Sequence, residues 1–206
     1  MHALLFEMKP RDGHEDHYFR HAAALRPRLE QHDGLIYIDR FKSTSRPGVI
    51  LSHSMWRDEA SLAKWRTDAH HHNSQAAGRN KHFEDYRIRI SHVLEHAAKG
   101  EETREWSDEG AYSTPESHAP RFLVIAGSRN APLPGRGEAF ASVNFDDVYV
   151  TVIEAQDAAA GREMTRSAAQ NTDVETASLC LISRDYGMFD RTEAPQYFPP
   201  VDAARP

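Results

Sequence analysis

Three consecutive histidines, His70, His71 and His72, carry the side chains best suited to proton transfer in the first half of the chain. Imidazole titrates near neutral pH, so such a residue can act as an acid, a base or a donor that positions an oxygen atom. Successive residues of a helix point about 100° apart, so all three cannot bind one metal ion from a regular helix. We therefore expect no metal site here and predict that His71 or His72 handles protons in a pocket; the alternative is a buried histidine whose hydrogen bonds are satisfied.

Two tryptophans flank this triplet. Trp56 and Trp65 are by default core residues, but together they could form a flat apolar wall for a planar aromatic ligand. Ser54 lies on the Trp56 face of its strand, and Tyr86 alternates with apolar residues, so both hydroxyls are candidates to enter a cavity. Arg79, by default exposed or interfacial, is a further candidate contact.

A second histidine pair lies nearer the N-terminus. His17 and His21 are four residues apart, on one face of a helical segment, and could ligate a metal or a heme. We favour the interpretation that these two histidines lie on a polar helix face exposed to solvent. The single cysteine, Cys180, lies in an apolar run and gives no disulfide framework.

The elements that must position these residues follow from hydrophobic periodicity. Apolar residues that alternate every second position predict strands, and apolar residues three to four positions apart predict helices. The first half reads as strands at 3–8, 35–43, 49–56 and 86–94, with helices over 18–29 and 59–76. This βαββαβ order is the ferredoxin-like arrangement. A continuous second helix would aim His72 the way Trp65 faces.

The second half repeats this order in a degenerate form. Strands at 122–126, 139–145, 148–153 and 174–182 surround one helix at 155–169, and a short Pro/Gly loop replaces the first helix. We therefore divide the chain into a ferredoxin-like domain (1–96), a linker (97–120), a degenerate second half (121–190) and an extended Pro-rich tail (191–206).

Bulk properties narrow the classes of partner. The chain has 206 residues and a formal net charge of −6, which argues against nucleic acid or an anionic membrane surface as the main partner. No apolar stretch reaches membrane-spanning length and no signal peptide is evident, so we expect a cytoplasmic protein.

Four segments together resemble the antibiotic biosynthesis monooxygenase family of the dimeric α+β barrel superfamily. They are DGLIYIDRF, LSHSMWRDEASLAKWR, HHHNSQAAGR and FEDYRIRI, within about residues 3–94. The resemblance implies paired sheets in a barrel and oxygenation of small, electron-rich aromatic or quinol-type substrates, often without metal or flavin. In that chemistry the substrate carbanion reduces dioxygen, and the protein supplies desolvation, a base and oxyanion contacts. Trp65 resembles the family's pocket tryptophan, and His71 aligns with the histidine that follows it in many members.

These observations predict an α+β protein, with a ferredoxin-like unit and a degenerate second copy in a barrel of the dimeric α+β type. The predicted function is a monooxygenase-type enzyme for a small aromatic, quinol or polyketide-like substrate, in a pocket between sheet and helix. His71, His72 and Asn73 are the predicted catalytic residues. The predicted substrate contacts are Trp56, Trp65, Ser54, Tyr86 and Arg79.

Two alternatives stay open at this point. One is a heme protein with an axial ligand from the triplet or from His17 or His21, and the other is a non-enzymatic binder of small ligands. No cofactor is expected in the leading case. The expected partners are a small substrate, dioxygen and a second copy of the chain in a homodimer, with no nucleic acid and no membrane.

Overall fold

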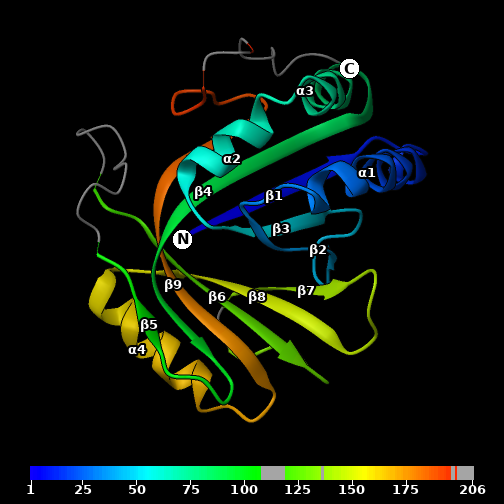
Figure 1. Cartoon of the computed structure of the whole chain (residues 1–206). Coiled ribbons are helices and arrows are strands. Elements are labelled where there is room, and N and C mark those ends of the chain that lie inside the picture. The colour runs from blue at the N-terminus through cyan, green and yellow to red at the C-terminus, as the bar shows by residue number, and fades with distance from the viewer. Residues whose placement is uncertain (108–118, 136, 196–197, 199–206) are drawn as a thin grey trace.

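The computed structural model describes residues 1–107, 119–135, 137–195 and 198 of the chain (Figure 1). The first half holds β1 (His2–Pro10), α1 (Glu15–Glu30), β2 (Leu35–Ser43), β3 (Ile50–Trp56), α2 (Glu59–Arg66), α3 (Ala69–Ala77), the π-helical turn η1 (Gly78–His82) and β4 (Phe83–Ala98). The short β5 (Arg104–Glu105), β6 (Phe122–Arg129), β7 (Glu138–Ser142), β8 (Val148–Ala155), α4 (Ala158–Ala169) and β9 (Val174–Gly187) follow.

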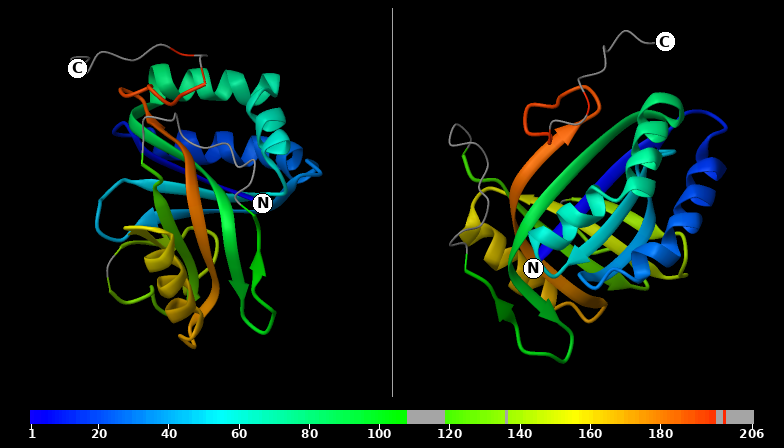
Figure 2. Two further views of the ribbon diagram at one scale, coloured as in Figure 1. Left: turned by 90° about the vertical axis from the view of Figure 1, so that its left-hand side faces the viewer. Right: turned by 45° about the horizontal axis from the view of Figure 1, so that its top comes forward.

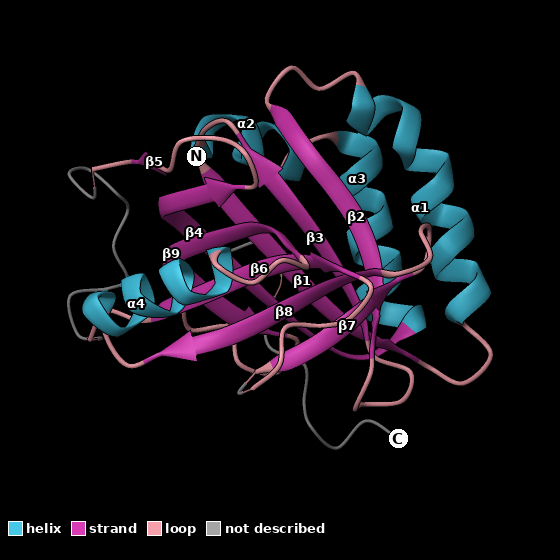
Figure 3. Ribbon diagram, turned by 90° about the horizontal axis from the view of Figure 1, so that it is seen from below, coloured by secondary structure: helices cyan, strands magenta, loops and turns pink. Residues whose placement is uncertain are grey.

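The strands of both halves form one sheet that closes on itself. Its order is β1-β3-β2-β7-β8-β6-β9-β4-β5, and β1 also pairs with β4. Because β5 pairs with β4 alone among the described strands, the other eight strands complete a ring (Figures 1 and 3). The chain is therefore an α+β barrel closed within a single polypeptide, which confirms the predicted fold class.

Apolar residues from both halves fill the inside of this barrel. Strand alternation places Ala3 and Leu5 of β1 inside, whereas Leu4 and Phe6 face the helices. The inner cluster is completed by side chains that are all buried: Phe41, Leu51, Met55, Val93, Leu123, Ile125, Phe140, Val150, Val152, Cys180 and Ile182. Burial raises the pKa of the Cys180 thiol to about 12, so the thiol stays protonated as part of the core.

The helices cover the outer faces unequally. α1, α2 and α3 lie against the strands of the first half, and α4 alone lies against those of the second (Figure 2). The side chain of Asp157 caps α4 by accepting a hydrogen bond from the Ala160 N–H at 2.8 Å. Gly161 lets α4 approach the sheet closely, because a Cβ at that position would lie 2.4 Å from Leu179 Cδ1.

The predicted division into four segments stays a prediction. β5 lies within the predicted linker, whose residues 108–118 are outside the described residues. Most of the predicted Pro-rich tail is also outside them. Within the described part of the chain, no helix combines the length and hydropathy needed to cross a membrane.

Candidate active site

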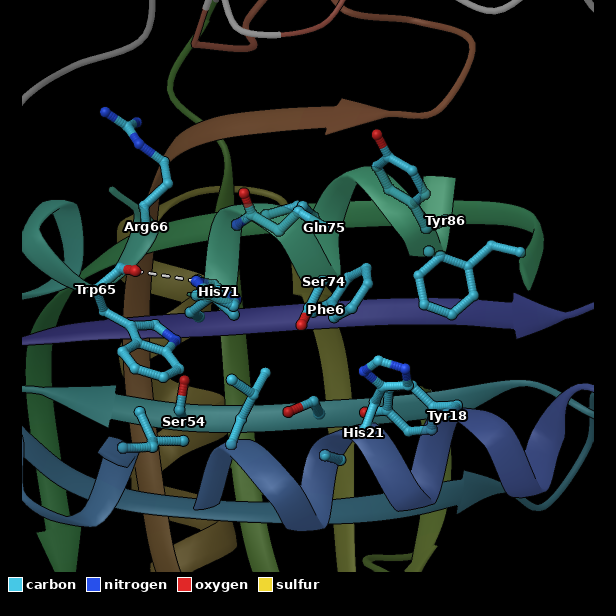
Figure 4. Close-up of a pocket in the computed structure, with 18 of the residues that line it drawn as sticks. Phe6, Tyr18, His21, Ser54, Trp65, Arg66, His71, Ser74, Gln75 and Tyr86 are labelled. Atoms are coloured by element: carbon cyan, nitrogen blue, oxygen red, sulfur yellow. Dashed lines mark hydrogen bonds between the residues drawn. The ribbon is translucent and has the colours of Figure 1, made fainter. Parts of the chain in front are cut away.

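A cavity of about 210 Å³ lies between the sheet of the first half and its helices (Figure 4). α1 forms one wall, α2 and α3 form the opposite wall, and β1 to β4 with the end of β9 form the floor. Most of its lining is apolar, which suits a small organic ligand, and a few polar groups enter it.

The floor is a row of side chains that runs across five strands. Strand register places Arg40 of β2 opposite Ser52 of β3, Ser52 opposite Phe6, Phe6 opposite Ile88, and Ile88 opposite Tyr186. All five side chains line the cavity. A period of two therefore builds a continuous surface with one charged end.

A parallel row carries a second polar group. Ser54 faces Ile38 on one side and Leu4 on the other. The Trp56 indole N–H donates to Ser54 Oγ at 2.9 Å, and both side chains are buried. The Ser54 hydroxyl thus accepts one hydrogen bond and keeps its own hydrogen for a ligand in the cavity.

The upper wall depends on a break between two short helices. α2 ends at Arg66, and the Asp68 carboxylate starts α3 by accepting hydrogen bonds from the His70 and His71 N–H groups, both at 3.0 Å. The expectation of one continuous helix is therefore wrong. The break brings His71, and not His72, onto the indole of Trp65.

His71 is held in a defined state against Trp65. The two rings are stacked with centroids 4.5 Å apart and an interplanar angle of 19°, and His71 Nδ1–H donates to the Trp65 carbonyl oxygen at 3.0 Å (Figure 4). Burial lowers the pKa of His71 below 6.5, against the opposing effects of this hydrogen bond and of Asp68. The ring is thus neutral at pH 7, with its proton on Nδ1 and a lone pair on Nε2, which is the state of a base.

The predicted catalytic residues His72 and Asn73 lie outside the cavity, as does His70, which was predicted only as an axial ligand in the heme alternative. His70 and Asn73 are exposed, and His72 stacks on Phe198 with ring centroids 5.4 Å apart. None of these three lines the cavity. One histidine of the triplet therefore reaches the cavity, with Trp56, Trp65, Ser54 and Tyr86 around it.

Arg79 does not line the cavity itself but holds Tyr86, which does. Its side chain is buried, and its Nη1 donates to the Tyr86 hydroxyl oxygen at 2.8 Å. Arg191 Nη1 donates to the same oxygen at 3.0 Å. The Tyr86 ring lines the cavity, so the two guanidinium groups fix its position through its hydroxyl.

His17 and His21 line the cavity at the other end, together with His82. The His17 ring lies 3.8 Å from that of His82 and 4.4 Å from that of His21, measured between centroids. Burial, then the neighbouring charges, lower the pKa values of His17 and His82. Among the described residues no group of three or more His, Cys, Asp or Glu is arranged to hold a metal ion.

Several lining residues were missed from the sequence. Arg40 alternates with Ile38 on one strand face, a signal that was available but that does not say which strand lies beside it. Tyr186 and Arg191 come from the far end of the chain, and no local pattern links them to the first half.

The chain matches known proteins along most of its length. The family model described as antibiotic biosynthesis monooxygenase matches residues 1–77. A curated relative named jasmonate monooxygenase ABM, from Pyricularia oryzae, is 35% identical over 220 aligned residues, which cover 98% of this chain and 100% of the relative.

Solved structures that match the chain share little sequence identity with it. A crystal structure of aldoxime dehydratase has a TM-score of 0.52 at 9% identity, covering 88% of this chain and 81% of that one. A putative monooxygenase from Lactobacillus acidophilus has a TM-score of 0.43 at 7% identity, covering 88% of this chain and 92% of that one.

Proposed function

The chain belongs to the antibiotic biosynthesis monooxygenase family and is a monooxygenase-type enzyme, and from that premise we propose its reaction and its site. It transfers one oxygen atom of dioxygen to a small, mostly apolar cyclic substrate bound between the sheet and α1 to α3. The observation that carries the proposal is the neutral His71 ring, stacked on Trp65 at the wall of an apolar cavity.

The shape and chemistry of the cavity support this substrate class. Aromatic side chains from β1, α1 and α2 line it, namely Phe6, Tyr18 and Trp65, and flat rings of this kind favour planar or cyclic ligands. Aromatic, quinol-type and polyketide-like molecules of one or two rings are therefore the first candidates. The name of the curated relative adds jasmonates, which are small cyclic carboxylates.

His71 supplies the base in the proposed reaction. Its Nε2 removes a proton from a CH2 group beside a carbonyl or an aromatic ring, and the carbanion passes one electron to dioxygen. The two radicals combine to a peroxide anion, C–OO−, which takes the proton back from His71 to give C–OOH and then loses water to give C=O. The carbon supplies all four electrons; one oxygen atom stays in the product and the other leaves as water.

A hydroxyl donor near the base stabilises the negative charge that develops on the substrate oxygen. Ser54 has its hydrogen free to donate because its oxygen accepts from Trp56. Ser74 also lines the cavity, but its hydroxyl donates to the His70 carbonyl oxygen at 3.2 Å, so Ser54 is the hydroxyl donor that we assign to the substrate. Preorganised donors in a site that excludes water are an effective source of such stabilisation.

A heme fits this cavity poorly. Its volume of about 210 Å³ is below the roughly 300–1,000 Å³ that suits drug-sized ligands, and a porphyrin is larger than most of these. The helices that carry the candidate axial residues His21 and His71 would have to move outward. We therefore propose cofactor-free chemistry.

We also propose a homodimer, although the barrel itself closes within one chain.

Oxygen consumption tests the proposal. The assay uses 2-indanone, a dihydroxynaphthalene and a jasmonate, each with and without NADPH, because hydroxylation of a non-acidic C–H bond needs two protons and, from a reductant, two electrons. His71→Ala should lower the rate by roughly 100- to 10,000-fold. His70→Ala, which removes an exposed imidazole one residue away, should leave it unchanged.

Other outcomes contradict the proposal in distinct ways. An active His71→Ala variant would show that His71 is not the base. Ligand binding without turnover would favour the non-enzymatic binder. A Soret band on addition of hemin, lost in the His71 or His21 variants, would favour the heme protein.

A further inference from the structure

The charged groups that line the cavity are all of one sign. Among its described lining residues none is an aspartate or a glutamate, although the chain has 31 acidic residues and a net charge of −6. Three arginines do line it: Arg40, Arg66 and Arg191. An apolar cavity whose only formal charges are positive attracts an anion.

Arg40 is the arginine best placed for this role. It stands at one end of the five-strand row on the floor, and no described ion pair includes it. Its Nε is buried and has no hydrogen-bond partner among the described residues. The neighbouring Asp39 carboxylate points to the other face of the sheet, where it accepts from Ser142 Oγ at 2.7 Å.

The next charged residue on the same strand face, Lys42, has an acidic partner and lies at the surface. Lys42 lies two residues further along β2, outside the cavity, and its Nζ pairs with Glu15 Oε1 at 2.5 Å. Its side chain is 52% exposed. The strand therefore carries one lysine with an acidic partner at the surface and one arginine without such a partner in the cavity.

Two hydroxyl groups complete the surroundings of Arg40. Strand register places Ser52 opposite Arg40, and both side chains act on the Tyr18 hydroxyl by lowering its pKa, against the larger effect of burial. Burial raises the pKa of Tyr18, so this hydroxyl keeps its proton at neutral pH and can donate it. A guanidinium fork binds a carboxylate through two parallel hydrogen bonds, and a hydroxyl group beside it can donate a further one.

We propose that Arg40, Tyr18 and Ser52 form an anion subsite that binds a carboxylate of the substrate. This inference rests on the proposed function, because it takes the cavity as the substrate site. Tyr18 lies at one end of the cavity and His71 with Trp65 at the other (Figure 4). The substrate is therefore a small apolar acid, held by its carboxylate at the α1 end with its apolar body extending toward His71.

Binding of a matched pair of probes tests the subsite without any turnover. Isothermal titration calorimetry compares naphthaleneacetate with naphthaleneacetamide, which has nearly the same shape and no charge. The wild-type chain should bind the acid at least about tenfold more tightly than the amide. Arg40→Gln should weaken the acid by roughly 10- to 100-fold and change the amide by less than about twofold.

Two further variants sharpen the result. Lys42→Gln removes a positive charge from the same strand face but outside the cavity, and should leave both probes unaffected. Tyr18→Phe keeps the ring and removes the hydroxyl, and should weaken the acid by several-fold. This variant serves as the test if Arg40→Gln does not fold, as judged by circular dichroism.

The subsite is refuted if wild-type protein binds acid and amide equally, if it binds neither, or if Arg40→Gln weakens both alike. Each of these results is independent of oxygen consumption. A chain that selects the acid through Arg40 but consumes no oxygen would retain the subsite and overturn the proposed reaction. A chain that oxygenates a substrate but does not select the acid would retain the proposed reaction and overturn the subsite.

Discussion

A buried histidine on the inner side of the sheet should make the stability of the barrel depend on pH. His53 of β3 alternates with the cavity residues Ser52 and Ser54 and therefore faces the barrel interior, where it is 6% exposed. Burial lowers its pKa from 6.5 to about 4, against the hydrogen bond that its Nδ1–H donates to the Leu4 carbonyl oxygen and against the charge of Asp39.

The direction of the effect follows from which form the folded state prefers. The folded chain holds His53 neutral, whereas the unfolded chain binds a proton near pH 6.5. The contribution of His53 to stability is therefore complete above pH 6.5 and is lost as the pH falls toward about 4. At about 1.4 kcal/mol per pH unit this amounts to roughly 3 kcal/mol, a large part of the 5–15 kcal/mol typical of a domain.

Urea denaturation at about pH 7.5 and pH 4.5 measures this contribution. His53→Gln keeps a polar side chain that does not titrate, so its free energy of unfolding should fall less on acidification than that of the wild type. Some dependence should persist, because burial also lowers the pKa of His2 to about 4. His70→Gln removes an exposed histidine and should behave as wild type. Equal pH dependence in wild type and His53→Gln would refute the reasoning.

Three further predictions concern the site and its support. Because burial lowers the pKa of His71 from its usual 6.5, kcat/KM should fall on acidification with a midpoint below pH 6.5, measured where circular dichroism shows the fold intact. Asp68→Ala removes the acceptor of two backbone N–H groups, so it should lower the free energy of unfolding, measured by thermal unfolding, by about 1 kcal/mol. It should also reduce the oxygenation rate more than the control Asp58→Ala, which removes the N-cap of α2. Gly161→Val forces a side chain against Leu179 and should destabilise the chain by about 1–3 kcal/mol in urea, with little change in ligand affinity, since α4 lies away from the cavity.

The sequence predicts β1 and β3 well because the two faces of each strand meet different surroundings, although β3 is buried along its whole length. Alternation in β1 and β3 follows directly from one face in the barrel and one toward the helices, so the period of two survives in the pattern. Closure of the barrel depends on contacts distant in sequence. The pairing of Phe41 in β2 with Ser142 in β7 joins the halves, and nothing local to either strand encodes that partner.

The site residues, too, fall into those that the local sequence pattern predicts and those that it does not. Trp56 and Ser54 could be assigned to one strand face from alternation alone, and both line the cavity. The choice among the three histidines could not be made, because it depends on two residues between α2 and α3. A continuous helix favours His72, and the cap at Asp68 restarts the helix so that His71 meets Trp65.

The two halves show how one repeated plan gives both a core and a site. In the second half Gly161 allows α4 to rest directly on Leu179, so helix and sheet pack together. In the first half the ring side chains of Phe6, Tyr18 and Trp65 stand between the sheet and the helices, and the space they frame is the cavity. The large side chains at these three positions thus keep the helices away from the sheet. The charge at Arg40 and the base at His71 lie at opposite ends of the resulting cavity. A smaller residue at position 65 should therefore change ligand affinity more than it changes the stability of the barrel, whose interior is filled from the other face of the sheet.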